Sequence, residues 1–149
     1  MHLHTKYLGE VEIDASKIIQ FPVGLPGFID ETEFALVDFP DNPIFQVLQS
    51  VKSVNTAFIV TNPYHFYHDY SFELDDSIVE SLEVKSEKDV MVVTIVTLKN
   101  PFNTSTLNLK APVIINPSSK QGKQYILNMD NIPAKAPISP GNHLKAGGE

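Results

Sequence analysis

The stretch Val90-Met-Val-Val-Thr-Ile-Val-Thr-Leu98 is the strongest strand signal in this chain. It consists mostly of β-branched residues, which are typical of β-strands. Alternate side chains of a strand point to opposite faces, and here both faces are apolar. One face holds Val90, Val92, Val96 and Leu98, and the other holds Met91, Val93 and Ile95. Two apolar faces predict a strand near the centre of a core.

Short apolar runs separated by Pro, Gly and Asn continue on both sides of this strand. The chain has 11 prolines, too many for a helical bundle of this size. Closely spaced short strands are typical of a barrel or sandwich. We therefore predict an all-β fold, a small antiparallel β-barrel-like domain. The expected strands cover residues 2–6, 10–13, 18–21, 34–39, 44–50, 56–61, 70–74, 106–109, 113–116 and 124–129.

One short helix is predicted near residues 75–83. Asp76 or Ser77 can cap its N-terminus, and Glu80 lies three residues after Ser77, the spacing of a capping box. The apolar residues Ile78, Val79 and Leu82 share one face. This pattern predicts a helix of about two turns that packs one side against the core.

Length and composition predict a single domain over residues 1–134. From residue 135 to 149 Pro, Ala, Lys and Gly prevail, so we expect a disordered C-terminal tail. The chain has no cysteine, which excludes disulfides and thiolate metal sites. It shows no signal-peptide pattern and no run of about 18 apolar residues. We expect a cytoplasmic protein that does not contact a membrane.

Acidic charge is concentrated in the first two thirds of the chain. Residues 1–98 hold 16 of the 18 acidic residues but only 5 of the 11 lysines, and the chain has no arginine. A pI near 5.1 without guanidinium groups argues against direct nucleic-acid binding. The acidic stretches either keep the protein in solution or form a surface for a basic partner. The main candidates are Asp69, Glu73, Asp75, Asp76, Glu80 and Glu83, and a second group is Asp30, Glu31 and Glu33.

The sequence lacks the common motifs of nucleophilic and nucleotide-dependent catalysis. It has no Gly-x-Ser-x-Gly elbow, no phosphate-binding glycine loop and no Gly-x-Gly-x-x-Gly. We therefore expect a protein that is not an enzyme and needs no cofactor. Two alternatives stay open. His65, His68 and Asp69 could hold the metal of a hydrolase, and a β-barrel could bind a small ligand in its mouth.

Two loops have either a structural or a binding interpretation. Residues 64–72 place five aromatic side chains within nine residues, and residues 21–28 contain two prolines and two glycines. Some of these side chains are expected in the core. Others could form a contact surface, where Tyr and Phe often serve as anchors. A stiff backbone would lower the entropy lost on binding.

Six sequence blocks in this order resemble the family of the flagellar assembly factor FliW. The resemblance spans residues 2 to about 130. The blocks are Ile19-Gln-Phe-Pro-Val-Gly-Leu-Pro-Gly-Phe28, Phe45-Gln-Val-Leu-Gln-Ser50, Ala57-Phe-Ile-Val-Thr-Asn-Pro63, Asp69-Tyr-Ser-Phe72, Thr106-Leu-Asn-Leu-Lys-Ala-Pro112 with Val113-Ile-Ile-Asn-Pro117, and Gln124-Tyr-Ile-Leu127.

This resemblance implies a cytoplasmic binding protein with two partners, flagellin and the RNA-binding translational regulator CsrA. It implies that the protein holds CsrA when flagellin is scarce, which relieves repression of flagellin translation, and releases CsrA when flagellin accumulates. The acidic stretch 69–83 is the expected CsrA contact. The expected apolar, aromatic and rigid-loop contacts are Phe21, Gly24, Leu25, Pro26, Gly27, Phe28, Pro63, Tyr64, Phe66, Tyr70, Asn108 and Pro112.

Overall fold

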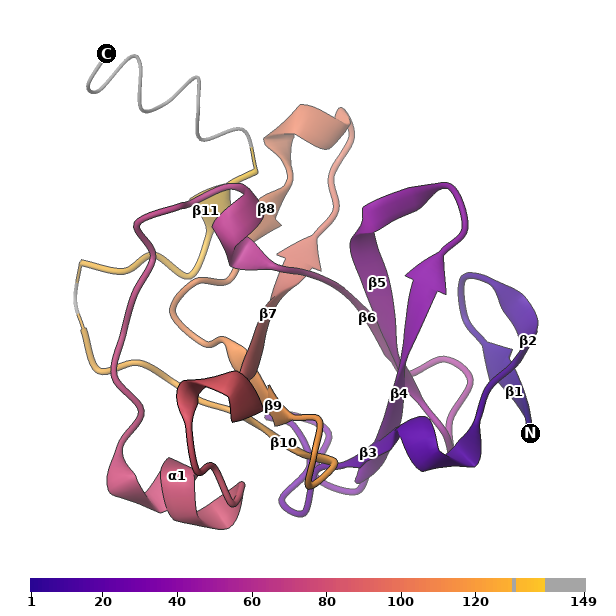
Figure 1. The fold of residues 1–149 in the computed structure, drawn as a ribbon. Coiled ribbons are helices and arrows are strands. Elements are labelled where there is room, and N and C mark those ends of the chain that lie inside the picture. The colour runs from indigo at the N-terminus through magenta and orange to yellow at the C-terminus, as the bar shows by residue number, and fades with distance from the viewer. Residues whose placement is uncertain (130, 139–149) are drawn as a thin grey trace.

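Seven strands close into a barrel in a computed structural model that describes residues 1–129 and 131–138. Their order around the ring is β7, β6, β5, β4, β3, β10 and β9, and pairing of β7 with β9 completes it (Figure 1). The barrel strands are β3 (Ile18–Gln20), β4 (Glu33–Phe39), β5 (Asn42–Ser50), β6 (Ala57–Thr61), β7 (Met91–Thr97), β9 (Val113–Asn116) and β10 (Gln121–Gln124). The prediction of an all-β, barrel-like fold is confirmed.

The central strand β7 lies where the sequence predicts it. It pairs with β6 and β9 in the ring and also with β8 (Thr106–Leu107), which in turn pairs with β11 (Ala136–Pro137). Among the described strands, the pairings are antiparallel except that of β10 with β3, where Gln121 pairs in parallel with Gln20. Single-turn 3-10 helices are η1 (Ala15–Lys17), η2 (Pro63–His65), η3 (Glu87–Asp89) and η4 (Phe102–Thr104).

Two predicted strands are not strands in the structure. Residues 70–74 lie between η2 and the helix α1 (Asp76–Ser81) without a strand partner. The strand predicted at 124–129 lies earlier in the chain, as β10. Lys120, just before β10, adopts a positive φ of 58°, which allows a tight turn from β9. Residues 125–129 run on from β10, and the N–H groups of Tyr125 and Leu127 still bond carbonyls of the 110–112 segment.

Side chains fill the inside of the barrel. They come from β3, β4, β5, β6, β7 and β9, and at one end Phe21 and Leu25 close the barrel with 0% and 1% exposure. Gly122 of β10 makes room for this plug, because a Cβ there would lie 2.6 Å from the Phe21 ring. A barrel packed in this way holds a core rather than a ligand cavity, which argues against the small-ligand alternative.

A second core lies outside the ring, where side chains of β8, β11 and the segments before α1 and after β10 pack against those of β5, β6 and β7. Ala136 and Ile138 are buried in it at 0% and 3% exposure, and the Ile138 N–H bonds the Ser105 carbonyl. The prediction of disorder from residue 135 is therefore wrong for 135–138, since two buried apolar side chains anchor them. The rest of the predicted tail, 139–149, lies outside the described residues.

The N-terminal hairpin of β1 (His2–Thr5) and β2 (Gly9–Glu12) forms a separate two-stranded sheet beside the barrel (Figure 1). Buried Gln49 links the two, because its Oε1 accepts the Lys6 N–H at 3.0 Å while its Nε2 donates to the carbonyls of Ser50, at the end of β5, and of Val54 in the following loop. Among the described residues, no helix has the length and apolar character to cross a membrane.

Candidate functional site

The acidic stretch is held in place by the short helix α1. Asp75 is its N-cap, and its carboxylate accepts the Ile78 N–H at 3.0 Å and the Ser77 hydroxyl at 2.8 Å. The helix was predicted correctly, but its predicted caps, Asp76 and Ser77, were wrong by one or two residues. Asp75 has the extended backbone of a cap residue, whereas Asp76 already lies in the first turn.

The other end of α1 is held by a residue that the sequence analysis did not single out. Asn116 at the end of β9 is 1% exposed, and its Nδ2 donates to the carbonyls of Leu82 at 2.7 Å and Glu83 at 3.2 Å. Its Oδ1 accepts the N–H groups of Ser118 and Ser119. One buried amide therefore closes both the helix C-terminus and the turn to β10. Only its place in the block Val113–Pro117 could have drawn attention to it.

All six residues of the main acidic group lie on the surface. Within the described part of the chain, none of them forms an ion pair with a lysine. Hydrogen bonds from Ser77 and from the Ile78 N–H lower the pKa of Asp75, so this carboxylate stays charged well below neutral pH. The stretch therefore presents negative charge that the described chain leaves without an ion pair. We call Asp69, Glu73, Asp75, Asp76, Glu80 and Glu83 the acidic surface.

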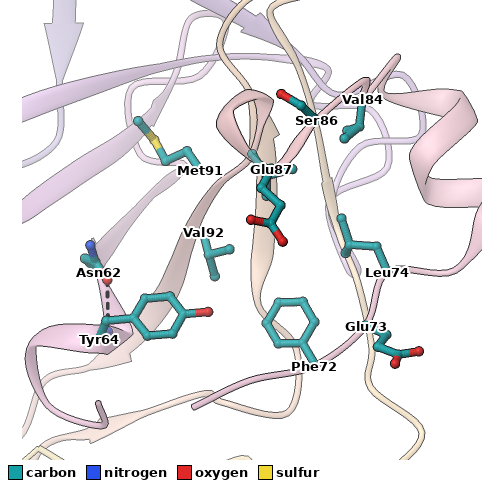
Figure 2. A pocket seen from close by; sticks show the side chains of 11 residues that line it. Asn62, Tyr64, Phe72, Glu73, Leu74, Val84, Ser86, Glu87, Met91 and Val92 are labelled. Carbon is teal, nitrogen blue, oxygen red and sulfur yellow. Dashed lines mark hydrogen bonds between the residues drawn. The ribbon is translucent and has the colours of Figure 1, made fainter. Parts of the chain in front are cut away.

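A cleft of about 830 Å³ opens next to this surface (Figure 2). The segment before α1 forms one wall with Phe72 and Leu74, and the start of β7 forms the opposite wall with Met91 and Val92. Figure 2 shows the carboxylates of Glu73 and Glu87 at the cleft, and none of the described lysines lines it. The cleft thus combines an apolar lining with negative charge.

The aromatic segment 64–72 belongs mostly to the core. Tyr70 is 9% exposed and donates from its hydroxyl to the Leu109 carbonyl at 2.6 Å. Burial raises the pKa of the Tyr70 hydroxyl, which therefore stays protonated as a donor. The Tyr67 hydroxyl donates to the Pro137 carbonyl at 2.6 Å and so ties η2 to β11.

Of the predicted aromatic contacts in this segment, only Tyr64 is well exposed, at 37%, and it reaches the cleft. Phe66 is half-buried and packs toward Phe45. Pro63 and Tyr70 are buried, so the prediction that they form a direct contact surface is wrong. The sequence pattern of residues 64–72 did not indicate which of their side chains face the core.

The rigid loop 21–28 is also mainly structural. Phe21 and Leu25 plug the barrel and Gly24 is buried, so the contact role predicted for these three residues is wrong. Gly24 has a φ of 68°, and a Cβ there would lie 2.6 Å from the Cα of Ile29, which explains the glycine. Exposed positions remain at Pro26, Gly27 and Phe28.

The last two predicted contacts, Asn108 and Pro112, lie beside β8 and β9. Pro112 is buried, which corrects its predicted exposure to a partner. Asn108 is half-buried, and its Oδ1 accepts the Ala111 N–H at 3.1 Å, as in a turn. Both residues therefore shape the connection between the strands.

The second acidic group is partly used within the fold. Glu31 accepts hydrogen bonds from the hydroxyls of Ser50 and Ser53, which lower its pKa. Glu33 accepts the Gln20 side-chain amide at 3.0 Å. Only Asp30 of this group is exposed without a side-chain bond to another described residue.

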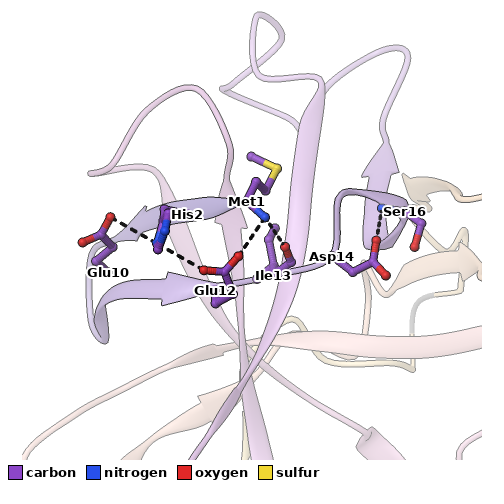
Figure 3. Close-up of polar contacts among 7 residues, drawn as sticks. All are labelled: Met1, His2, Glu10, Glu12, Ile13, Asp14 and Ser16. Carbon is purple, nitrogen blue, oxygen red and sulfur yellow. Dashed lines mark hydrogen bonds and ion pairs between the residues drawn. The ribbon is translucent and has the colours of Figure 1, made fainter.

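The N-terminal hairpin carries a further polar group. His2 lies between Glu12 and Glu10, with its Nδ1 at 3.3 and 3.5 Å from their carboxylates, and the α-amino group of Met1 bonds Glu12 (Figure 3). Among the described residues, no three His, Cys, Asp or Glu side chains are placed to hold a metal ion. His65, His68 and Asp69 therefore do not form the ligand set of the hydrolase alternative.

Comparison with known proteins identifies the family. The family model for FliW protein matches residues 2–138. The chain belongs to the FliW family. It is 51% identical to the flagellar assembly factor FliW of Oceanobacillus iheyensis, over 93% of this chain and 94% of that protein. The FliW of Bacillus subtilis is 42% identical, over 93% of this chain and 96% of the relative.

The fold agrees with this assignment. A crystal structure of the flagellar assembly factor FliW matches with a TM-score of 0.88 and 36% identity, covering 94% of this chain and 98% of that one. The match to the FliW model ends at residue 138, where β11 and the buried Ile138 complete the second core. The FliW domain therefore includes residues 135–138, the first four residues of the predicted tail.

Proposed function

We propose that this FliW-family chain binds flagellin and the translational regulator CsrA in the cytoplasm and exchanges one for the other. Its membership of a family of flagellar assembly factors supports a role in building the flagellum. In the proposed cycle, the chain holds CsrA while flagellin is scarce and so relieves repression of flagellin translation. Accumulating flagellin takes the chain and releases CsrA.

The observation that supports CsrA binding most directly is the acidic surface without ion pairs to described lysines. CsrA is a basic RNA-binding protein, and opposite potentials speed encounter and favour the correct partner. The lack of arginine and the pI near 5.1 support a role as a protein ligand of such a regulator rather than as an RNA-binding protein itself.

Titration calorimetry with purified flagellin and purified CsrA tests the proposal. We expect a stoichiometric complex with each partner, and we expect added flagellin to displace CsrA. If neither protein binds at micromolar concentration in near-physiological salt, the proposed function is wrong.

Association kinetics test the role of the acidic surface. We expect Asp76→Lys and Glu80→Lys to slow association with CsrA, with a smaller effect at high salt and little change in dissociation. Asp75 is unsuitable for charge reversal because it caps α1. Asp41→Lys, an equal charge change in the turn between β4 and β5, is the matched control. Equal on-rates in all variants would contradict a steering role.

A further inference from the structure

One wall of the cleft is an extended segment with free backbone groups. Residues 71–74 make no backbone hydrogen bond to any described residue. Their side chains nevertheless alternate as in a strand, with Phe72 and Leu74 half-buried and Ser71 and Glu73 exposed. Exposed, unpaired backbone of this kind can template pairing with another chain.

The opposite wall of the cleft is the start of β7, where one edge of this strand has no paired strand beside it. The β6–β7 ladder ends at the pair Thr61↔Thr94, because Asn62 and Pro63 turn away into η2. Met91 and Val92 extend beyond this last pair, and both line the cleft. On their other side they pair with β9. The β6 side of β7 therefore lacks a described strand partner at the cleft.

The lining indicates what side chains an added strand would carry. Phe72, Leu74 and Val92 offer apolar surface, whereas Glu73 and Glu87 offer carboxylates (Figure 2). Within residues 1–129 and 131–138, no lysine lines the cleft. Glu87 is held by η3, whose capping box joins Ser86 and Asp89. An occupant that matches these walls is extended, with alternate apolar side chains and at least one lysine or arginine.

We propose that this cleft binds an extended basic–apolar segment of a partner protein, which adds as a strand along the free edge of β7 or along residues 71–74. Backbone hydrogen bonds supply affinity in such β-addition, and pockets for alternate side chains supply specificity. The inference rests on the proposed function, and it assigns the segment to CsrA, the basic partner.

Amide exchange measured by NMR on the full chain, free and saturated with CsrA, tests the inference. We expect slower exchange in the complex, by about tenfold, for the amides that pair with the added strand. These are amides within Ser71–Leu74, or whichever of the Met91 and Val92 amides points away from β9. We also expect Glu87→Lys to weaken CsrA binding several-fold, with Asp41→Lys as the matched control. Carbon-13 shifts of the bound CsrA segment should indicate an extended backbone.

The outcomes separate the two proposals. If CsrA binds but these amides stay unprotected, or if its bound segment is helical, the strand-addition inference is overturned while the proposed function stands. The same holds if Asp41→Lys weakens binding as much as Glu87→Lys. The same exchange measurement with flagellin in place of CsrA identifies which partner supplies the segment. If flagellin protects these amides and CsrA does not, the assignment to CsrA is wrong. Failure of both proteins to bind removes the proposed function and this inference with it.

Discussion

Replacing Asn116 by Ala should both destabilise the protein and loosen α1. The buried side-chain amide makes four hydrogen bonds, of 2.7, 3.2, 2.9 and 3.3 Å, to backbone groups of the helix end and the β9–β10 turn. In the variant, the Leu82 carbonyl keeps the Ser119 hydroxyl as a donor at 3.0 Å. Water can reach the Glu83 carbonyl, since that residue is exposed.

The magnitude follows from the bonds that nothing replaces. Two N–H groups of the turn lose their acceptor, and each lost bond costs about 1 kcal/mol, with more for a group left unsatisfied in the interior. We therefore expect the free energy of unfolding to fall by about 2–3 kcal/mol. Because α1 has only six residues, most of its stability must come from packing and from bonds such as these.

Urea denaturation at pH 7, followed by circular dichroism, measures this change. Asn55→Ala is the matched control, because Asn55 is exposed and makes no side-chain bond to a described residue; it should lie within about 0.5 kcal/mol of the unchanged protein. Amide exchange of α1 should also become faster in Asn116→Ala. A loss no larger than that of the control, with unchanged α1 exchange, would refute the assignment of Asn116 as the clamp of this helix.

Three further variants test other parts of the fold. Gly122→Ala should lower the free energy of unfolding by about 1–3 kcal/mol in the same urea assay, because the new methyl group meets the Phe21 ring; an unchanged value would show that the plug can shift freely. Tyr67→Phe should cost about 1 kcal/mol and speed amide exchange near Ile138, since it removes the bond to the Pro137 carbonyl; unchanged exchange there would contradict a tie between η2 and β11. Glu31 has a lowered pKa from its two serine hydroxyl bonds, so its stabilisation is present above the ordinary glutamate value of 4.5 and is lost as pH falls through the lower folded pKa. Glu31→Gln should therefore be less stable than the unchanged protein at pH 7, with a difference that shrinks toward pH 3 in urea titrations, and a difference independent of pH would count against this origin.

Local patterns in the sequence were sufficient for the main elements. The doubly apolar run 90–98 predicted the strand that became β7, and the apolar face of 75–83 predicted α1. The ordered blocks were sufficient to predict the FliW family. Strand and helix periodicity depend on neighbours a few residues away, so these features can be read from one sequence.

Only the tertiary structure decided which of the patterned residues are buried and which are exposed. The 21–28 loop contains Phe21 as a barrel plug and Phe28 as a surface residue, although both are phenylalanines beside a turn. The alternating segment 70–74 has a strand pattern but no described strand partner. Asn116 holds the end of α1 through a hydrogen bond to the Leu82 carbonyl, 34 residues earlier in the chain. Burial, pairing and long-range hydrogen bonds depend on which distant segments meet, and that information lies in the closed barrel rather than in any local stretch of sequence.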